Sequence, residues 1–198
     1  MKLLKENWGT FKATYSDSNP NDPKWKEDFD KVDQKIMEAA KTVRSGKNLM
    51  DAHETLEEIR FIFLELRKRN GIDYYIDPLS EFHPLMEVIV HTAAENDPDT
   101  LTDSDKETIR EQYDQASKIW NRIKTSDFDR DLYGFNDEKM AKMKKLLKME
   151  SEALNKLKKA LDDNNNALII TTAIAIKSNY AKLYKLFGDF DRVKGKRS

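Results

Sequence analysis

The sequence of 198 residues has no cysteine, few glycines and prolines, and almost no excess of charge of either sign. The missing cysteine excludes disulfides, thiolate metal sites, cysteine nucleophiles and covalent haem attachment. The formal net charge is −1, from 35 basic and 36 acidic residues, so no global field would draw the chain to nucleic acid. The basic segment 192–197 could contact phosphate, but a solvated tail is the simpler interpretation.

Long hydrophobic runs are absent as well. The most apolar stretch, residues 167–176, is interrupted by Thr171 and Thr172 and is far shorter than the roughly 20 residues that cross a bilayer. We therefore expect no membrane span. The N-terminal residues lack the apolar core of a secretory signal peptide, which by itself does not decide where the protein resides.

Charged residues make up 36% of the chain and hydrophobic residues 38%, a composition typical of long exposed helices. Apolar residues recur at steps of three and four in seven segments, and no strand pattern competes with them. The sequence therefore predicts an all-α fold, an up-down bundle of about seven helices in one domain over residues 1–198. The expected helices cover residues 4–15, 23–44, 49–66, 77–93, 104–123, 137–161 and 166–187.

Local signals predict how these helices begin and pair. Asp22 precedes Pro23 as a cap before a first-turn proline, and Ser104 with Glu107 has the spacing of a capping box. If the chain contains an internal duplication, the long hairpins 23–66 and 137–187 should form a four-helix core, with the other helices on its flanks or completing it. A tryptophan-bearing helix precedes each hairpin, which suggests an internal duplication; coincidence between two generic hairpins explains the pattern equally well.

Two charged residues fall in helical stripes that are otherwise apolar. Glu150 interrupts the series of residues 140–161, and Lys177 interrupts the series of residues 170–187. Counted from the connection near Asn164, both lie at almost the same depth, so we expect them to be inward-facing neighbours. The pair either fixes the register of the hairpin, or tilts outward to water, or lines a ligand pocket together with Tyr180 and Tyr184.

Histidine followed by glutamate four residues later occurs as His53 with Glu57 and as His83 with Glu87. Residues at this spacing share a helix face, so the two pairs could hold one transition metal ion between facing helices. Each histidine could instead be a boundary residue bonded to its own glutamate. Arg60 lies on the flank of His53 and is expected to pair with Glu57 or with a bound anion.

Three short motifs resemble small exported helical-bundle proteins of bacteria, a group of uncharacterised role. They are Ala-His-x-x-Leu-Glu-x-Ile-Arg at 52–60, Phe-His-x-x-Met-Glu at 82–87 and Leu-Phe-Gly-Asp-Phe at 186–190. The fold is also similar to that of the periplasmic four-helix cytochromes, but the last helix has no histidine, so the resemblance implies no haem. It implies a bundle and a periplasmic location.

No nucleophile-base arrangement, phosphate-binding glycine loop or dinucleotide fingerprint is present to suggest catalysis. We therefore expect a non-catalytic binding bundle that holds a transition metal ion or a small polar ligand between helices. The alternative is a structural or protein-interaction bundle with a buried Glu-Lys pair and no ligand.

Overall fold

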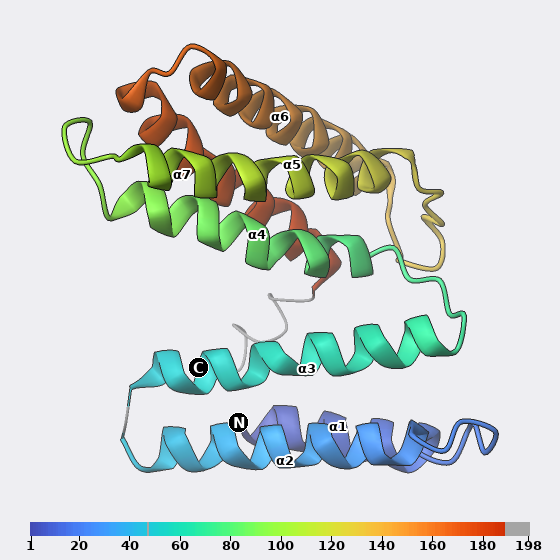
Figure 1. Cartoon of the computed structure of the whole chain (residues 1–198). Coiled ribbons are helices and arrows are strands. Elements are labelled where there is room, and N and C mark those ends of the chain that lie inside the picture. The colour runs from blue at the N-terminus through green and yellow to red at the C-terminus, as the bar shows by residue number, and fades with distance from the viewer. Residues whose placement is uncertain (47, 189–198) are drawn as a thin grey trace. The chain divides into compact units, whose positions relative to one another are not determined.

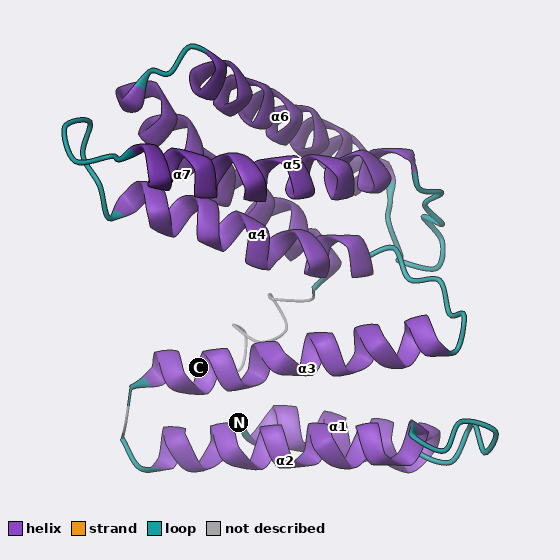
Figure 2. Ribbon diagram, viewed as in Figure 1, coloured by secondary structure: helices purple, strands orange, loops and turns teal. Residues whose placement is uncertain are grey.

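A computed structural model of the protein describes residues 1–46 and 48–188, and within these ranges it contains helices and no strand (Figures 1 and 2). The all-α prediction is confirmed. The basic segment 192–197 lies outside the described residues. The helices are α1 (Lys2–Tyr15), α2 (Trp25–Arg44), α3 (Leu49–Arg69), α4 (Asp77–Ala94), α5 (Asp103–Thr125), α6 (Asp137–Asp162) and α7 (Asn166–Tyr184), followed by the short 3-10 helix η1 (Lys185–Phe187).

The chain forms two compact units, Met1–Tyr74 and Tyr75–Ser198. We call them the first and the second unit and describe each by itself. The single domain expected over residues 1–198 stays a prediction, as does the internal duplication.

The first unit contains α1, α2 and α3. Helices α2 and α3 lie side by side as a hairpin (Figure 1). Helix α1 packs on this hairpin through large rings. Trp8 of α1 packs against both Phe29 of α2 and Phe63 of α3, with ring centroids 5.6 Å and 6.1 Å away. The indole N–H of Trp8 also donates to the carboxylate of Asp33. Aromatic side chains therefore attach the first helix to the hairpin.

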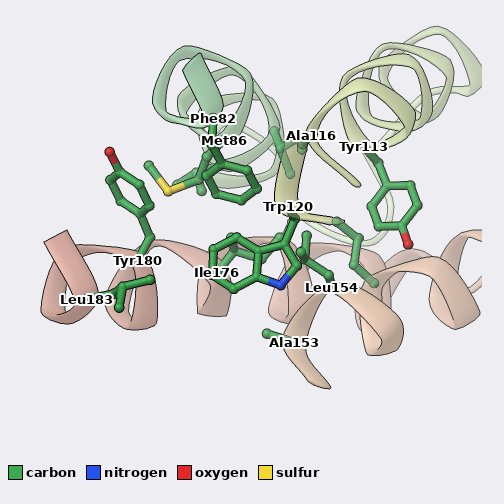
Figure 3. Close-up of a cluster of buried hydrophobic side chains, with 14 of the residues drawn as sticks. Phe82, Met86, Tyr113, Ala116, Trp120, Ala153, Leu154, Ile176, Tyr180 and Leu183 are labelled. Atoms are coloured by element: carbon green, nitrogen blue, oxygen red, sulfur yellow. The ribbon is translucent and has the colours of Figure 1, made fainter. Parts of the chain in front are cut away.

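The second unit is a four-helix bundle of α4, α5, α6 and α7. Each helix packs against two neighbours, because α4 and α6 both contact α5 and α7. Phe82 and Met86 of α4 meet Trp120 of α5, Leu154 of α6 and Ile176 of α7 in a continuous apolar core (Figure 3). The predicted combination of hairpins was therefore wrong: the four-helix core is made by α4–α7, and the α2–α3 hairpin has a core of its own.

Helix caps explain where most helices begin. The side chains of Asn48, Asn136 and Asn165 each accept a hydrogen bond from a first-turn amide of α3, α6 and α7. The predicted capping box of α5 is displaced by two residues, to Thr102 and Asp105, which bond reciprocally.

Asp22 does not cap α2, which begins at Trp25. Its carboxylate accepts a hydrogen bond from the backbone N–H of Lys24 at 3.0 Å and binds Arg69 of α3. Asp22 was predicted to cap α2, but its carboxylate instead binds the distant Arg69.

No helix in the described part of the chain is both long and apolar enough to cross a membrane.

Candidate functional site

Glu150 occupies the middle of the core-facing stripe of α6. Its neighbours along that stripe, Leu146, Ala153, Leu154 and Leu157, are all buried. The Glu150 side chain is itself 0% exposed, and neither of its carboxyl oxygens has a hydrogen-bond partner among the described residues. The prediction that Glu150 points inward is confirmed.

An aromatic layer crosses the bundle at the level of Ser151, the residue that follows Glu150 in α6. The hydroxyl of Ser151, the next residue of α6, accepts a hydrogen bond from the Trp120 indole at 2.9 Å. Trp120 packs on Phe82 at 5.4 Å between ring centroids, and Phe82 stacks on Tyr180 at 5.6 Å (Figure 3). Glu150 therefore lies at the level of an aromatic layer that spans the bundle, far from the charges on its surface.

Burial dominates the acid-base behaviour of this carboxyl. Removal from water disfavours the charged form and raises the pKa of Glu150 to about 8. The side chain of Asn179 on α7 acts in the opposite direction and lowers the pKa somewhat, without reaching hydrogen-bond geometry. At neutral pH the carboxyl is therefore predominantly protonated and uncharged.

Lys177 does not face Glu150. Its side chain is 54% exposed, and its ammonium lies 2.8 Å from the carboxylate of Glu87 on α4. The predicted inward direction of Lys177 and its pairing with Glu150 were therefore wrong. The cause is that α7 is apolar on several sides, so the sequence allows more than one core stripe. The stripe in the structure consists of Ile169, Ala173, Ile176, Tyr180 and Leu183.

The two tyrosines predicted to line a pocket pack instead against the α4 side of the bundle. Tyr180 is buried, and its hydroxyl donates a hydrogen bond of 2.9 Å to the backbone carbonyl of Leu79. Tyr184 is half-buried beside it, with ring centroids 5.9 Å apart. The Tyr180 hydroxyl therefore joins α7 to α4.

Four of the predicted site residues meet between α4 and α7, where Tyr180 is buried and the other three lie nearer the surface. His83 lies 3.3 Å from Glu87, which also binds Lys177, and the imidazole stacks on the Tyr180 ring at 5.5 Å. Two of the four predicted metal ligands, His83 and Glu87, therefore lie beside two of the residues predicted to line a ligand pocket. Because Glu87 is already engaged by two basic groups, the arrangement is a surface ion-pair network rather than an open ligand site.

The other histidine pair lies on α3 in the first unit. His53 is 60% exposed, and one carboxylate oxygen of Glu57 lies 3.2 Å from both the His53 imidazole and the Arg60 guanidinium. The prediction that Arg60 pairs with Glu57 is confirmed. Residues 1–46 and 48–188 contain no group of three or more histidine, cysteine or acidic side chains that could hold a metal ion. Each unit supplies one histidine and one glutamate of the predicted set, so the metal site that would combine all four ligands stays a prediction.

A cleft of about 190 Å³ lies between α6 and α7. Met149, Ala153 and Ala175 provide apolar walls, and Asn179 also lines the cleft. Asn179 is thus the residue shared by the cleft and by the buried Glu150. Asn179 was not among the predicted site residues. It lies 15 positions after Asn164 and Glu150 lies 14 before it, so equal depth along the hairpin is the sequence signal that marks it.

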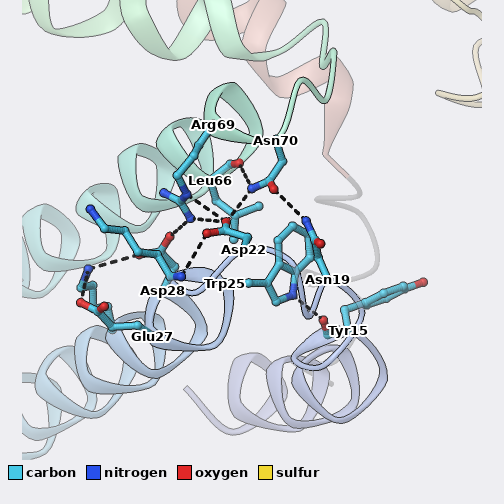
Figure 4. A network of polar contacts seen from close by, with 11 residues as sticks. Tyr15, Asn19, Asp22, Trp25, Glu27, Asp28, Leu66, Arg69 and Asn70 are labelled. Atoms are coloured by element: carbon cyan, nitrogen blue, oxygen red, sulfur yellow. Dashed lines mark hydrogen bonds and ion pairs between the residues drawn. The ribbon is translucent and has the colours of Figure 1, made fainter.

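A second polar cluster was missed in the first unit. The Arg69 guanidinium binds the carboxylates of Asp22 at 2.7 Å and Asp28 at 2.6 Å (Figure 4). The Asn70 amide donates to the same oxygen of Asp22 at 2.7 Å. These contacts hold the pKa of Asp22 at about 2 and connect the loop before α2 with the end of α3. Its members lie far apart in the sequence, so no local spacing marks them.

No protein-family model, curated protein or solved structure matches the chain. The resemblance to exported bacterial bundles and the periplasmic location implied by it stay predictions.

Proposed function

We propose that the second unit is a non-catalytic binding bundle that takes a small polar ligand in the cleft between α6 and α7, beside the carboxyl of Glu150. The observation that supports this proposal is the complete burial of Glu150 without a hydrogen-bond partner among the described residues. The cleft supplies an approach to that carboxyl, because Asn179 borders both.

The free-energy cost of this arrangement supports a functional role. Burying a polar group without a hydrogen bond costs about 1–3 kcal/mol in proteins, and an apolar residue of similar size would avoid that cost. A carboxyl that fixes helix register needs a partner across the interface, and Lys177 instead binds Glu87. Strongly perturbed groups beside a cleft occur preferentially at functional sites.

The proposal is limited to organic ligands. Transition metal ions in proteins are held by several nitrogen, oxygen or sulfur donors, and Glu150 and Asn179 supply only one carboxyl and one amide. The size of the cleft is informative, since a cavity of about 150 Å³ accommodates benzene. A ligand of about six non-hydrogen atoms fits the α6–α7 cleft.

Fragment titration followed by amide NMR tests the proposal. The panel consists of alcohols, amides and amines with four to six non-hydrogen atoms, added to the full chain. We expect at least one of them to shift the signals of Ala153, Ala175 and the Asn179 side-chain amide at millimolar concentrations. A panel that leaves all three signals unchanged refutes the proposed site.

A filled cleft provides the matched control. Ala175 lines the cleft, so Ala175→Leu should abolish the shifts. Ala167 is an exposed alanine of the same helix that does not line the cleft, so Ala167→Leu should leave them intact. Equal effects of the two substitutions would mean that the fragments bind elsewhere.

A further inference from the structure

Glu150 is chemically distinct from the other buried polar residues in residues 1–46 and 48–188. It is the one residue there with buried side-chain oxygens that lack a hydrogen-bond partner. Both oxygens are in this state, so a ligand has two acceptor positions available when the carboxyl is ionised. A protonated amine is the ligand group that matches them best, since it donates three hydrogen bonds and neutralises the carboxylate.

The remainder of the cleft restricts the ligand further. Its walls are apolar at Met149, Ala153 and Ala175, which suits a short hydrocarbon body. Glu152 and Lys156 carry opposite charges on the same cleft, so its lining has no net charge. Charge selectivity must therefore come from the carboxyl behind Asn179.

On this basis we infer that the α6–α7 cleft binds a small organic ammonium ion, which displaces the proton of Glu150 and forms an ion pair with its carboxylate. This inference rests on the proposed function and names its ligand class. The exchange is balanced: the ammonium ion keeps its own three protons, the carboxyl releases one proton to solvent, and the bound pair is neutral. Asn179 has to turn aside, and its amide oxygen can then accept a hydrogen bond from the ammonium.

Among the described residues, polar side chains near this level on α5 and α7 are engaged elsewhere and do not neutralise the Glu150 carboxylate. On α7, Lys177 is exposed and binds Glu87, and the Tyr180 hydroxyl donates to the Leu79 carbonyl. On α5, Trp120 uses its indole N–H on Ser151. The pKa of Glu150 responds to burial and to Asn179, and to no charged residue.

The exchange predicts a specific pH dependence. The free carboxyl has a pKa of about 8, so an ammonium ion must remove a proton from most molecules at neutral pH. Below that pKa the affinity should rise about tenfold for each pH unit. A neutral ligand of the same shape leaves the carboxyl protonated, so its affinity should not change with pH.

The test compares n-butylamine with 1-butanol on the full chain by NMR titration at pH 6.0 and 7.5, and measures proton release in a pH-stat. We expect butylamine to bind about 25-fold more tightly at pH 7.5 than at pH 6.0, and to release about one proton per molecule bound at pH 6.0 and about 0.8 at pH 7.5. Butanol should show neither effect. Glu150→Gln should abolish both effects for butylamine, whereas Glu138→Gln, at an exposed position on the same helix, should preserve them.

The outcomes separate the two proposals. If butanol binds in the cleft and butylamine does so without pH dependence or proton release, the ligand class is wrong and the binding site stands. If butylamine binding survives Glu150→Gln but is lost in Glu152→Gln, the amine is held on the surface and the inference is overturned. If neither probe binds, both proposals fail.

Discussion

At the residue scale, the dominant feature is a carboxyl that keeps its proton at neutral pH. The pKa of Glu150 is raised to about 8 in the folded chain, whereas the pKa of a glutamate in an unfolded chain is about 4.3. Between these values the folded state holds a proton that the unfolded state has lost. The contribution of this group to stability is therefore complete below about pH 4 and declines as the pH rises toward 8.

The direction in which stability changes with pH gives the first prediction. Relative to Glu150→Gln, the wild-type second unit should lose about 1.4 kcal/mol of unfolding free energy per pH unit between pH 5 and 7.5. Glu150→Met should stabilise the unit by about 3 kcal/mol at pH 7, because it removes the linkage and the desolvation cost. Urea unfolding followed by Trp120 fluorescence, with Trp8 and Trp25 replaced by phenylalanine, measures the second unit.

Two results would contradict this linkage. One is a wild-type stability that runs parallel to that of Glu150→Gln across the pH range. The other is a loss of stability in Glu150→Met at pH 7, which would mean that the carboxyl makes a favourable contact in the folded state.

Lys177 provides the second prediction. Its ion pair with Glu87 is largely exposed, and exposed pairs contribute about 0.5 kcal/mol or less. Lys177→Met should therefore change the unfolding free energy of the second unit by no more than about 0.5 kcal/mol in urea denaturation. A loss of about 3 kcal/mol or more is the value expected for breaking a buried pair. Such a loss would show that Lys177 pairs with Glu150 after all.

The sequence was informative for Glu150 and misleading for Lys177 for one physical reason. Helix α6 has charged residues on its outer faces, so its apolar stripe has a single direction and Glu150 lies within it. Helix α7 has apolar residues on several faces, and a shift of one position rotates a side chain by about 100°. Lys177 follows Ile176 of the true stripe, so this rotation takes it out of the core.

At the element scale, α1 depends on ring packing for its attachment to the first unit. Trp8 is its one buried residue and contacts rings from both α2 and α3. Phe11 stacks on Phe29 at 5.9 Å but is 43% exposed. Trp8 and Phe11 therefore contribute unequally to the attachment of α1.

The third prediction follows from this difference. Trp8→Ala should destabilise the packing of α1 by about 3 kcal/mol, because it removes a large buried ring and leaves Asp33 without its indole donor. Hydrogen exchange over residues 2–15 should accelerate accordingly. Phe11→Ala is the matched control and should cost about 1 kcal/mol. Equal acceleration in the two variants would show that α1 is held by exposed contacts instead.

Helix positions were predictable to within a few residues because they follow from local periodicity and caps. The sequence predicted residues 137–161 for α6, which spans Asp137–Asp162. The start of α2 was placed two residues too early, since Asp22 is engaged by Arg69 from a distant part of the chain. Local chemistry could not show that contact.

At the scale of the whole molecule, the two units respond to acid in opposite directions. Protonation favours the second unit between about pH 8 and 4 through Glu150. In the first unit, the Arg69 guanidinium holds the pKa of Asp22 at about 2, so the stabilisation is present above about pH 4 and is lost as the pH falls toward 2.

The fourth prediction concerns this acid limit. Arg69→Met should raise the pKa of Asp22 and move the acid unfolding midpoint of the first unit upward by about one pH unit. Trp8 and Trp25 fluorescence in a Trp120→Phe background follows that unit. Lys68→Met, which removes an exposed charge from the same helix, should leave the midpoint unchanged. An unshifted midpoint in Arg69→Met would contradict the role of the cluster.

The assembly of the helices was less predictable than the helices themselves. The all-α fold follows from periodicity, but which hairpins share a core depends on contacts between residues far apart in the chain. Helices α4 and α7 combine high apolar content with direct packing, and together with α5 and α6 they close a core. The sequence showed the two long hairpins equally clearly and carried no local signal that α4 and α5 would complete the second of them.

The protonated state of Glu150 is the claim on which the candidate site depends, and carboxyl NMR measures it directly. In protein labelled with ¹³C at the glutamate carboxyl carbon, one resonance should titrate near pH 8 and disappear in Glu150→Gln. If the resonance lost in Glu150→Gln titrates between about pH 4 and 5, as a glutamate in water does, the carboxyl is hydrated and the site does not exist.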